Sequence, residues 1–252
     1  MIIYRIYGKT VEITKTQKEP STRRGVSSTR KVRGIINPRR IDSVRRTRRI
    51  CLRKLLSAFE DFGAPLLITL TFSGSASDVL LSSRRLSYFQ RRLQNRFPGS
   101  QSLFIPELSP RNRIHYHGLL FGVSQDWGDN KKGKRTISVG RERKERLFQK
   151  LWGYGFVDVL QTDGSPRLGY YLTKYIAKST SEPLFAPIRL VRSSRGFPRE
   201  IEVRGLLAEE LYRRYDLKKP DFESEFYTPF LGNITKRFYT IDNFVRKDDI
   251  NL

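Results

Sequence analysis

The segment from residue 66 to residue 178 switches repeatedly between the two periodicities that distinguish strands from helices. Short β-branched or alternating apolar runs predict strands, whereas apolar residues that recur every three or four positions predict helices. The order strand, helix, hairpin, helix, strand, helix indicates an α+β domain, in which helices back an antiparallel sheet. The predicted strands are Leu66–Phe72, Leu103–Leu108, Ile114–Phe121 and Phe156–Gln161, and the predicted helices are residues 41–62, Asp78–Phe97, Arg141–Trp152 and Ser165–Lys178.

The chain carries a large excess of positive charge. Its 252 residues include 49 Lys and Arg against 25 Asp and Glu, which gives a formal charge of +24. Such an excess favours a polyanionic partner, and nucleic acid is the first candidate. Much of it lies between Ser21 and Lys54, a stretch that either binds DNA or is a solvated tail. The arginines that we expect to contact DNA are Arg39, Arg40, Arg45, Arg46, Arg111 and Arg113.

Composition also narrows the class of protein. A hydrophobic content of 38% suffices for a packed core. The sequence has no run of 18 apolar residues and no secretory signal at its N-terminus, so we expect an intracellular protein in the cytoplasm of a host cell, without a membrane partner. Cys51 is the only cysteine, which excludes an internal disulfide and a cysteine-based zinc site.

The only two histidines, His115 and His117, lie two residues apart in a predicted strand. Side chains alternate across a strand, so both imidazoles lie on one face. If the loop 109–113 forms a symmetric hairpin, Glu107 lies directly opposite His115 on that face. Two imidazoles and one carboxylate with open positions suit Mg²⁺ or Mn²⁺ when a phosphate completes the coordination. The alternative is a half-buried histidine pair without a metal.

A second motif lies in the last predicted helix, where two tyrosines and two lysines share one stripe. Tyr171, Lys174, Tyr175 and Lys178 follow the spacing i, i+3, i+4 and i+7. A cation beside a phenol favours the phenolate, and a phenolate near a metal-bound phosphodiester is a competent nucleophile. The alternative is an ordinary amphipathic helix whose tyrosines pack and whose lysines are solvated.

Together these motifs resemble the HUH endonucleases, and most closely the rolling-circle replication initiators of microvirus-type single-stranded DNA phages and related plasmids. The resemblance covers about residues 66–178. Four segments carry it in the family's order: Leu67–Phe72, Ile114–Phe121 with its Gly after the second histidine, Leu151–Phe156, and Tyr171–Lys178 with the spacing YxxKYxxK.

The resemblance implies a metal-dependent nickase of single-stranded DNA with a ferredoxin-like, five-stranded antiparallel sheet. In this family pattern, His115, His117 and Glu107 are the metal ligands and the ion polarises the scissile phosphate. Tyr171 attacks to form a 5′-phosphotyrosine and a free 3′-hydroxyl, and Tyr175 takes the second tyrosine position used for strand joining. Lys174 and Lys178 balance charge at the phosphate. The implied partners are a single-stranded or hairpin origin and a host helicase and polymerase.

These considerations divide the chain into three parts: a basic N-terminal extension and helix at 1–62, an endonuclease core at 63–182, and a C-terminal extension at 183–252 that packs on the core. The C-terminal part contains several aromatic residues among charges, which either pack against a sheet or stack on unpaired bases. They are Phe222, Phe226, Tyr227, Phe230, Phe238, Tyr239 and Phe244.

Two classes of function remain open from the sequence. The first is the replication initiator, with a transposase or relaxase as a near relative that uses the same chemistry. The second is a basic nucleic-acid-binding or packaging protein without catalysis, whose function resides in its charge. Only the first class predicts that tyrosine substitution or metal chelation abolishes covalent attachment to DNA.

Overall fold

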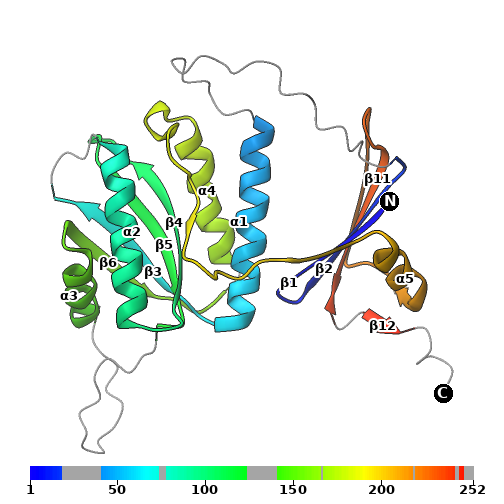
Figure 1. Ribbon diagram of the computed structural model, residues 1–252, viewed down its shortest axis with the longest axis horizontal. Coiled ribbons are helices and arrows are strands. Elements are labelled where there is room, and N and C mark those ends of the chain that lie inside the picture. The colour runs from blue at the N-terminus through cyan, green and yellow to red at the C-terminus, as the bar shows by residue number, and fades with distance from the viewer. Residues whose placement is uncertain are drawn as a thin grey trace, which may run out of the picture. The chain divides into compact units, whose positions relative to one another are not determined.

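A computed structural model of the protein describes residues 1–18, 41–73, 78–123, 141–165, 167–217, 219–241 and 244–246. The chain divides into a central unit, residues 36–198, and a terminal unit, which combines residues 1–35 with 199–252 (Figure 1). Each unit is built on a five-stranded antiparallel sheet that carries helices. The predicted α+β class is therefore confirmed, whereas the ferredoxin-like arrangement stays a prediction.

The sheet of the central unit has the strand order β6-β3-β5-β4-β7. Helices α1 and α4 lie on one side of this sheet and α2 and α3 on the other (Figure 1). All strands and helices predicted between residues 41 and 178 are present, with ends within two residues of those expected. The strands are β3 (Leu66–Phe72), β4 (Gln101–Leu108), β5 (Ile114–Phe121), β6 (Gly155–Gln161) and β7 (Arg192–Ser193), and the helices are α1 (Ile41–Phe62), α2 (Val79–Arg96), α3 (Arg141–Trp152), α4 (Arg167–Thr180) and the short 3₁₀ helix η1 (Pro183–Phe185).

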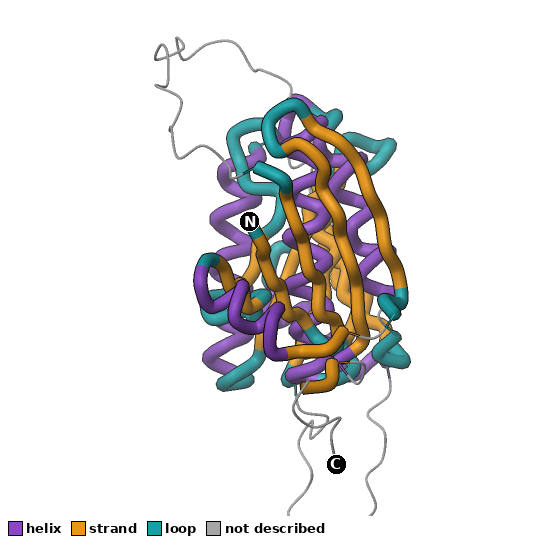
Figure 2. The backbone as a smooth tube through the Cα atoms, turned by 90° about the vertical axis from the view of Figure 1, so that its right-hand side faces the viewer, coloured by secondary structure: helices purple, strands orange, loops and turns teal. Residues whose placement is uncertain are grey.

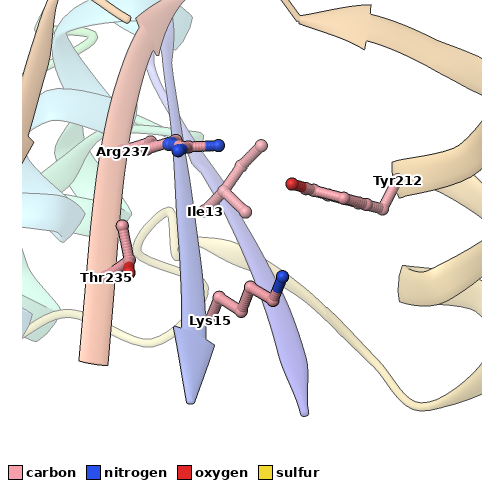
Figure 3. A pocket seen from close by; sticks show the side chains of 5 residues that line it. All are labelled: Ile13, Lys15, Tyr212, Thr235 and Arg237. Atoms are coloured by element: carbon pink, nitrogen blue, oxygen red, sulfur yellow. The ribbon is translucent and has the colours of Figure 1, made fainter. Parts of the chain in front are cut away.

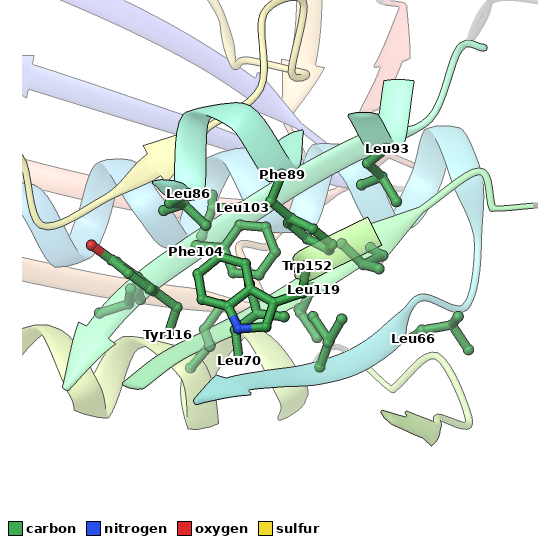
Figure 4. Packing of buried hydrophobic residues seen from close by; sticks show 14 of the residues in the cluster. Leu66, Leu70, Leu86, Phe89, Leu93, Leu103, Phe104, Tyr116, Leu119 and Trp152 are labelled. Carbon is green, nitrogen blue, oxygen red and sulfur yellow. The ribbon is translucent and has the colours of Figure 1, made fainter. Parts of the chain in front are cut away.

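The face of the central sheet that carries α2 and α3 is apolar. Alternate residues of β3 from Leu66 to Phe72 are buried there, as the strand periodicity requires. Trp152, at the end of α3, is fully buried among them (Figure 4). Its indole lies 4.9 Å from the Phe72 ring and 5.8 Å from the Phe89 ring of α2, measured between centroids. This cluster joins both helices to the sheet.

Gly118, in the middle of β5, permits close packing on the same face. A Cβ atom at this position would lie 2.8 Å from the carbonyl oxygen of Leu103 and would also overlap the Phe104 ring. Phe104 is fully buried against Phe89 of α2. The glycine that follows the histidine pair therefore makes room for an aromatic side chain of the neighbouring strand.

The terminal unit joins the two ends of the chain in one sheet, whose order is β10-β11-β2-β1-β8 (Figure 2). Helix α5 packs on it through a small core that includes Tyr4, Ile13, Ala208 and Tyr239. A two-stranded ribbon, β9 with β12, completes the unit. The elements are β1 (Ile2–Tyr7), β2 (Thr10–Thr16), β8 (Ile201–Arg204), α5 (Leu206–Arg214), β9 (Tyr215–Leu217), β10 (Phe222–Thr228), β11 (Gly232–Thr240) and β12 (Phe244–Arg246).

This division differs from the one that the sequence suggested. Helix α1 belongs to the central unit, and residues 199–252 form a sheet with the N-terminal strands. The pairing of β2 with β11 joins residues more than 200 positions apart, and such long-range contacts leave no local pattern in a sequence. Among the described helices, none has both the length and the apolar character needed to cross a membrane.

The C-terminal aromatic residues divide between the two roles considered for them. Tyr239 is buried in the small core of the terminal unit. Phe222, Phe226 and Tyr227 of β10 and Phe230 of the following turn are all exposed. The side chain of Phe244 lies outside the described residues. Packing therefore accounts for only part of this aromatic set.

Candidate active site

The face of the central sheet toward α4 carries a polar row at one end. In the observed register, Leu108 pairs with Ile114 and Glu107 pairs with His115, as the symmetric hairpin predicts. On the other side of β5, Thr71 pairs with His115 and Thr69 pairs with His117. Three adjacent strands thus present a carboxylate, two imidazoles and two hydroxyls on one face.

Two threonines of β3 orient the histidine rings. The Thr71 hydroxyl lies 3.0 Å from Nδ1 of His115, and the Thr69 hydroxyl lies 3.2 Å from Nδ1 of His117. The two imidazoles are nearly parallel, with an angle of 9° and centroids 6.4 Å apart. Because Nδ1 of each ring is engaged, Nε2 is the atom that each ring directs to other partners.

These threonines were not among the predicted site residues. A signal was present, because Thr69 and Thr71 share the i, i+2 spacing of the histidines and lie in the neighbouring strand. Their apolar neighbours hid it, since the run from Leu66 to Phe72 has the pattern of an ordinary buried strand.

Glu107 connects the histidine face to α4. Its Oε2 lies 2.6 Å from Nε2 of His117, and its Oε1 accepts a hydrogen bond from the ammonium of Lys178. Burial raises the pKa of Glu107, but the hydrogen bonds from Lys178 and His117 outweigh this effect and lower the pKa below its ordinary value. The same contact raises the pKa of Lys178. Glu107 is therefore ionised at neutral pH.

Both imidazoles are neutral at neutral pH. Burial lowers the pKa of His117, although hydrogen bonding to Glu107 partly opposes this. Burial and the neighbouring His117 lower the pKa of His115. The neutral ring is the form that can donate a lone pair to a metal ion.

The two predicted tyrosines of α4 lie next to this cluster. Their hydroxyl oxygens are 2.6 Å apart. The Tyr175 ring stacks on His117 with a centroid distance of 4.1 Å and an angle of 14°. Burial raises the pKa of Tyr175, and its hydrogen bond with Tyr171 raises it further. Tyr171 is 42% exposed, so the phenol of this pair that a substrate reaches more easily is that of Tyr171.

Three local features hold α4 in this position. Leu172 and Ile176 are fully buried on the opposite side of the helix. Gly169 allows close approach of α1, because a Cβ atom there would lie 3.2 Å from Leu52. At the other end, the Ser179 hydroxyl donates to the carbonyl oxygen of Pro106, the residue before Glu107. The helix is thus anchored directly beside the carboxylate.

The remaining predicted site residues are placed less closely. Lys174 is exposed on α4, as are Arg45 and Arg46 on α1 and Arg111 in the hairpin loop. Arg113 is half-buried, and its charge contributes to the lowered pKa of His115. Arg39 and Arg40 lie outside the described residues.

The donor chemistry of Glu107, His115 and His117 fits a divalent cation. The carboxylate is ionised, both imidazoles are neutral, and their Nδ1 atoms are fixed by threonine hydroxyls in the way that orients metal-binding histidines. Two of the donors are hydrogen-bonded to each other. Within the described ranges, no three His, Cys, Asp or Glu side chains are already grouped around one ion position.

Residues 65–180 match the model of a protein family described as replication-associated protein, of the ORF2 type. The matched segment runs from β3 through α4 and includes Glu107, both histidines and both tyrosines. No curated protein and no solved structure matches the chain significantly. The match supports a role in DNA replication, and the terminal unit lies outside it.

Proposed function

We propose, from the premise that residues 65–180 resemble replication-associated proteins, that the protein is a rolling-circle replication initiator. It nicks single-stranded origin DNA through a tyrosine and later rejoins the strands. One observation carries this proposal: the paired phenols of Tyr171 and Tyr175 adjoin His117, which is hydrogen-bonded to Glu107. A nucleophile pair and a set of metal-type donors therefore occupy the same face.

We assign the first attack to Tyr171 because it is the more exposed phenol. Its oxygen forms a bond to the scissile phosphorus while the bond from phosphorus to the 3′ oxygen breaks. The phenol gives up one proton to solvent, and the departing 3′ oxygen takes one up, so the protons balance. The products are a 5′-phosphotyrosine and a 3′-hydroxyl that a host polymerase extends, with a host helicase to separate the strands.

Glu107, His115 and His117 are the residues that would hold Mg²⁺ or Mn²⁺. When bound, the ion supplies Lewis-acid polarisation of the scissile phosphate. Lys178 and Lys174 contribute fixed positive charge on the same helix as the nucleophiles, where charge develops on the phosphate oxygens. The two threonines keep the imidazoles directed at the site.

Tyr175 provides the second nucleophile for strand joining. Its hydroxyl lies 2.6 Å from that of Tyr171, so both phenols lie close to one phosphate-binding position. Attack by Tyr175 on a second origin phosphate releases a new 3′-hydroxyl. That hydroxyl attacks the first phosphotyrosine, which restores a phosphodiester and frees Tyr171. Two tyrosines one turn apart thus permit nicking and closure without hydrolysis of the covalent intermediate.

The test is covalent attachment to labelled single-stranded oligonucleotides that tile the DNA element encoding the protein. With Mn²⁺, we expect the purified chain to form a protein–DNA band that survives denaturing gel electrophoresis and disappears with EDTA. Tyr171→Phe should reduce the band strongly, and the double variant Tyr171→Phe/Tyr175→Phe should abolish it.

Tyr170→Phe is the matched control. Tyr170 is also an exposed tyrosine of α4, but it is not part of the hydrogen-bonded pair. Its substitution should leave the covalent band at wild-type intensity. Binding without any covalent band across the whole element, or a band that persists in the double variant, would instead indicate a non-catalytic nucleic-acid-binding protein or a different nucleophile.

A further inference from the structure

The terminal unit contains a small pocket between its sheet and α5. Ile13 and Lys15 of β2, Thr235 and Arg237 of β11, and Tyr212 of α5 line it (Figure 3). Its volume is about 120 Å³. A cavity of roughly 150 Å³ accepts a benzene ring, so this pocket admits one chemical group of a ligand and not a whole nucleotide.

Cations and hydroxyl groups dominate the lining. The Lys15 ammonium lies 5.9 Å from the centre of the Tyr212 ring, and the Arg237 guanidinium extends toward Tyr212 (Figure 3). The Tyr212 and Thr235 hydroxyls add hydrogen-bonding groups. An ammonium, a guanidinium and hydroxyls around a small cavity are the groups that bind a phosphate.

Two carboxylates of β10 adjoin this lining. Glu223 accepts a hydrogen bond from Nε of Arg237 at 2.9 Å, and Glu225 accepts one from the Thr235 hydroxyl at 3.1 Å. Both glutamates are exposed. The Glu223 contact orients the guanidinium, and it raises the pKa of Arg237. Within the described part of the chain, no carboxylate forms a salt bridge with Lys15.

We propose that this pocket binds a backbone phosphate of a single-stranded nucleic acid. The charge of the whole chain, +24, favours such a polyanion over a neutral ligand. The size of the pocket fits one phosphate while the rest of the strand stays outside. The terminal unit thus supplies a phosphate contact that is independent of the chemistry proposed for the central unit.

The experiment measures binding of a fluorescent oligothymidylate by anisotropy over a series of salt concentrations. It uses the full chain with Tyr171→Phe/Tyr175→Phe, so that covalent trapping does not contribute and a failed nicking reaction does not affect the result. Adding Lys15→Met/Arg237→Met should weaken binding at least about tenfold and reduce the salt slope by about one. Thermal unfolding of each variant checks the fold, which should persist because Lys15 is exposed and Arg237 is 37% exposed.

Lys9→Met/Arg204→Met is the matched control, since it removes the same two charges from the terminal unit at exposed positions outside the pocket lining. Arg204 also pairs with a glutamate, Glu202, at 2.6 Å, as Arg237 pairs with Glu223. This control should change the affinity less than about threefold. Equal losses in the two double variants would overturn the proposal, because general electrostatics would then explain both.

A second arm distinguishes a strand from a free small ligand. Inorganic phosphate is titrated into the same protein by calorimetry, with and without Lys15→Met/Arg237→Met. The proposal expects only weak binding of phosphate alone, since a strand adds contacts outside the pocket. Tight, pocket-dependent phosphate binding with unchanged affinity for the oligonucleotide would assign the pocket to a small phosphorylated ligand and overturn the proposal.

Discussion

The two faces of the central sheet use the same strands for different purposes. On the side of α2 and α3, every second residue of β3 and β5 is apolar or aromatic and nearly all are fully buried. On the side of α4, the residues between them are threonines and histidines near one end of the sheet. The residues compared are Ile68, Leu70, Tyr116 and Leu120 on the first face, and Thr69, Thr71, His115 and His117 on the second.

This difference teaches how a strand of seven or eight residues supports both stability and a polar site. Because the side-chain period is two, the two sets are chemically independent although they alternate along the chain. Burial on the apolar face fixes the backbone, and the fixed backbone then holds the polar groups in register. Substitutions on the two faces should therefore separate loss of stability from loss of activity.

The largest expected effect is on the apolar face. Trp152→Ala removes an indole that is fully buried against Phe72 and Phe89, and it also removes the hydrogen bond from Nε1 to the carbonyl oxygen of Thr71. Truncation of a buried tryptophan costs about 3–5 kcal/mol of unfolding free energy. Urea denaturation followed by circular dichroism measures this loss.

Phe156→Ala provides the comparison within the same unit. Phe156 is also a large aromatic residue, but it is 61% exposed on β6. Its truncation should change the unfolding free energy by no more than about 0.5 kcal/mol. A loss for Trp152→Ala as small as that for Phe156→Ala would show that the indole cluster does not hold α2 and α3 on the sheet.

An intermediate effect is expected on the polar face. Thr69→Val/Thr71→Val keeps the shape of both side chains but removes the hydroxyls that contact Nδ1 of each histidine. Loss of such orienting groups typically lowers metal affinity or activity about 10–100-fold. The measurements are the rate of covalent attachment to the origin oligonucleotide as a function of Mn²⁺ concentration, and the unfolding free energy, which should change by less than about 1 kcal/mol.

Thr14→Val controls for the general loss of a hydroxyl from a strand. Thr14 is a buried residue of β2 in the terminal unit, where its hydroxyl contacts Glu12. This variant should attach to DNA at the wild-type rate. If the Thr69/Thr71 variant also kept that rate, at every Mn²⁺ concentration, the hydroxyls would have no part in positioning the imidazoles.

The register of the polar site could be predicted from the sequence because it depends on local features. The five-residue loop between Leu108 and Ile114 sets Glu107 opposite His115, and the spacing of Tyr171 and Tyr175 sets both phenols on one side of α4. These rules use only neighbouring residues, so no knowledge of the tertiary structure was needed.

Other features of the site depend on packing between distant segments. The carboxylate of Glu107 contacts His117 and not its strand partner His115, and this choice follows from the position of Lys178 on α4. The docking of Ser179 on Pro106 likewise joins residues 73 positions apart. No periodicity encodes such contacts, and the same holds for the sheet that joins the two ends of the chain.

The smallest expected effect concerns Cys51 of α1, which is buried in the central core. Burial raises the pKa of its thiol to about 12. In the unfolded chain the thiol ionises at about pH 8.5, so above that pH the unfolded state has lost a proton that the folded state keeps. Stability must therefore fall as the pH rises, by about 1 kcal/mol between about pH 8.5 and 9.5 from this group alone.

Cys51→Val isolates this contribution, because valine fills a similar apolar space and does not titrate. The difference in unfolding free energy between the variant and the wild type should grow in favour of the variant as the pH rises across this range. A difference that is independent of pH would mean that the thiol ionises at similar pH in both states. The core around α1, which supports α4 through Gly169, would then be open to solvent, and the dry support assumed for the polar face would be lost.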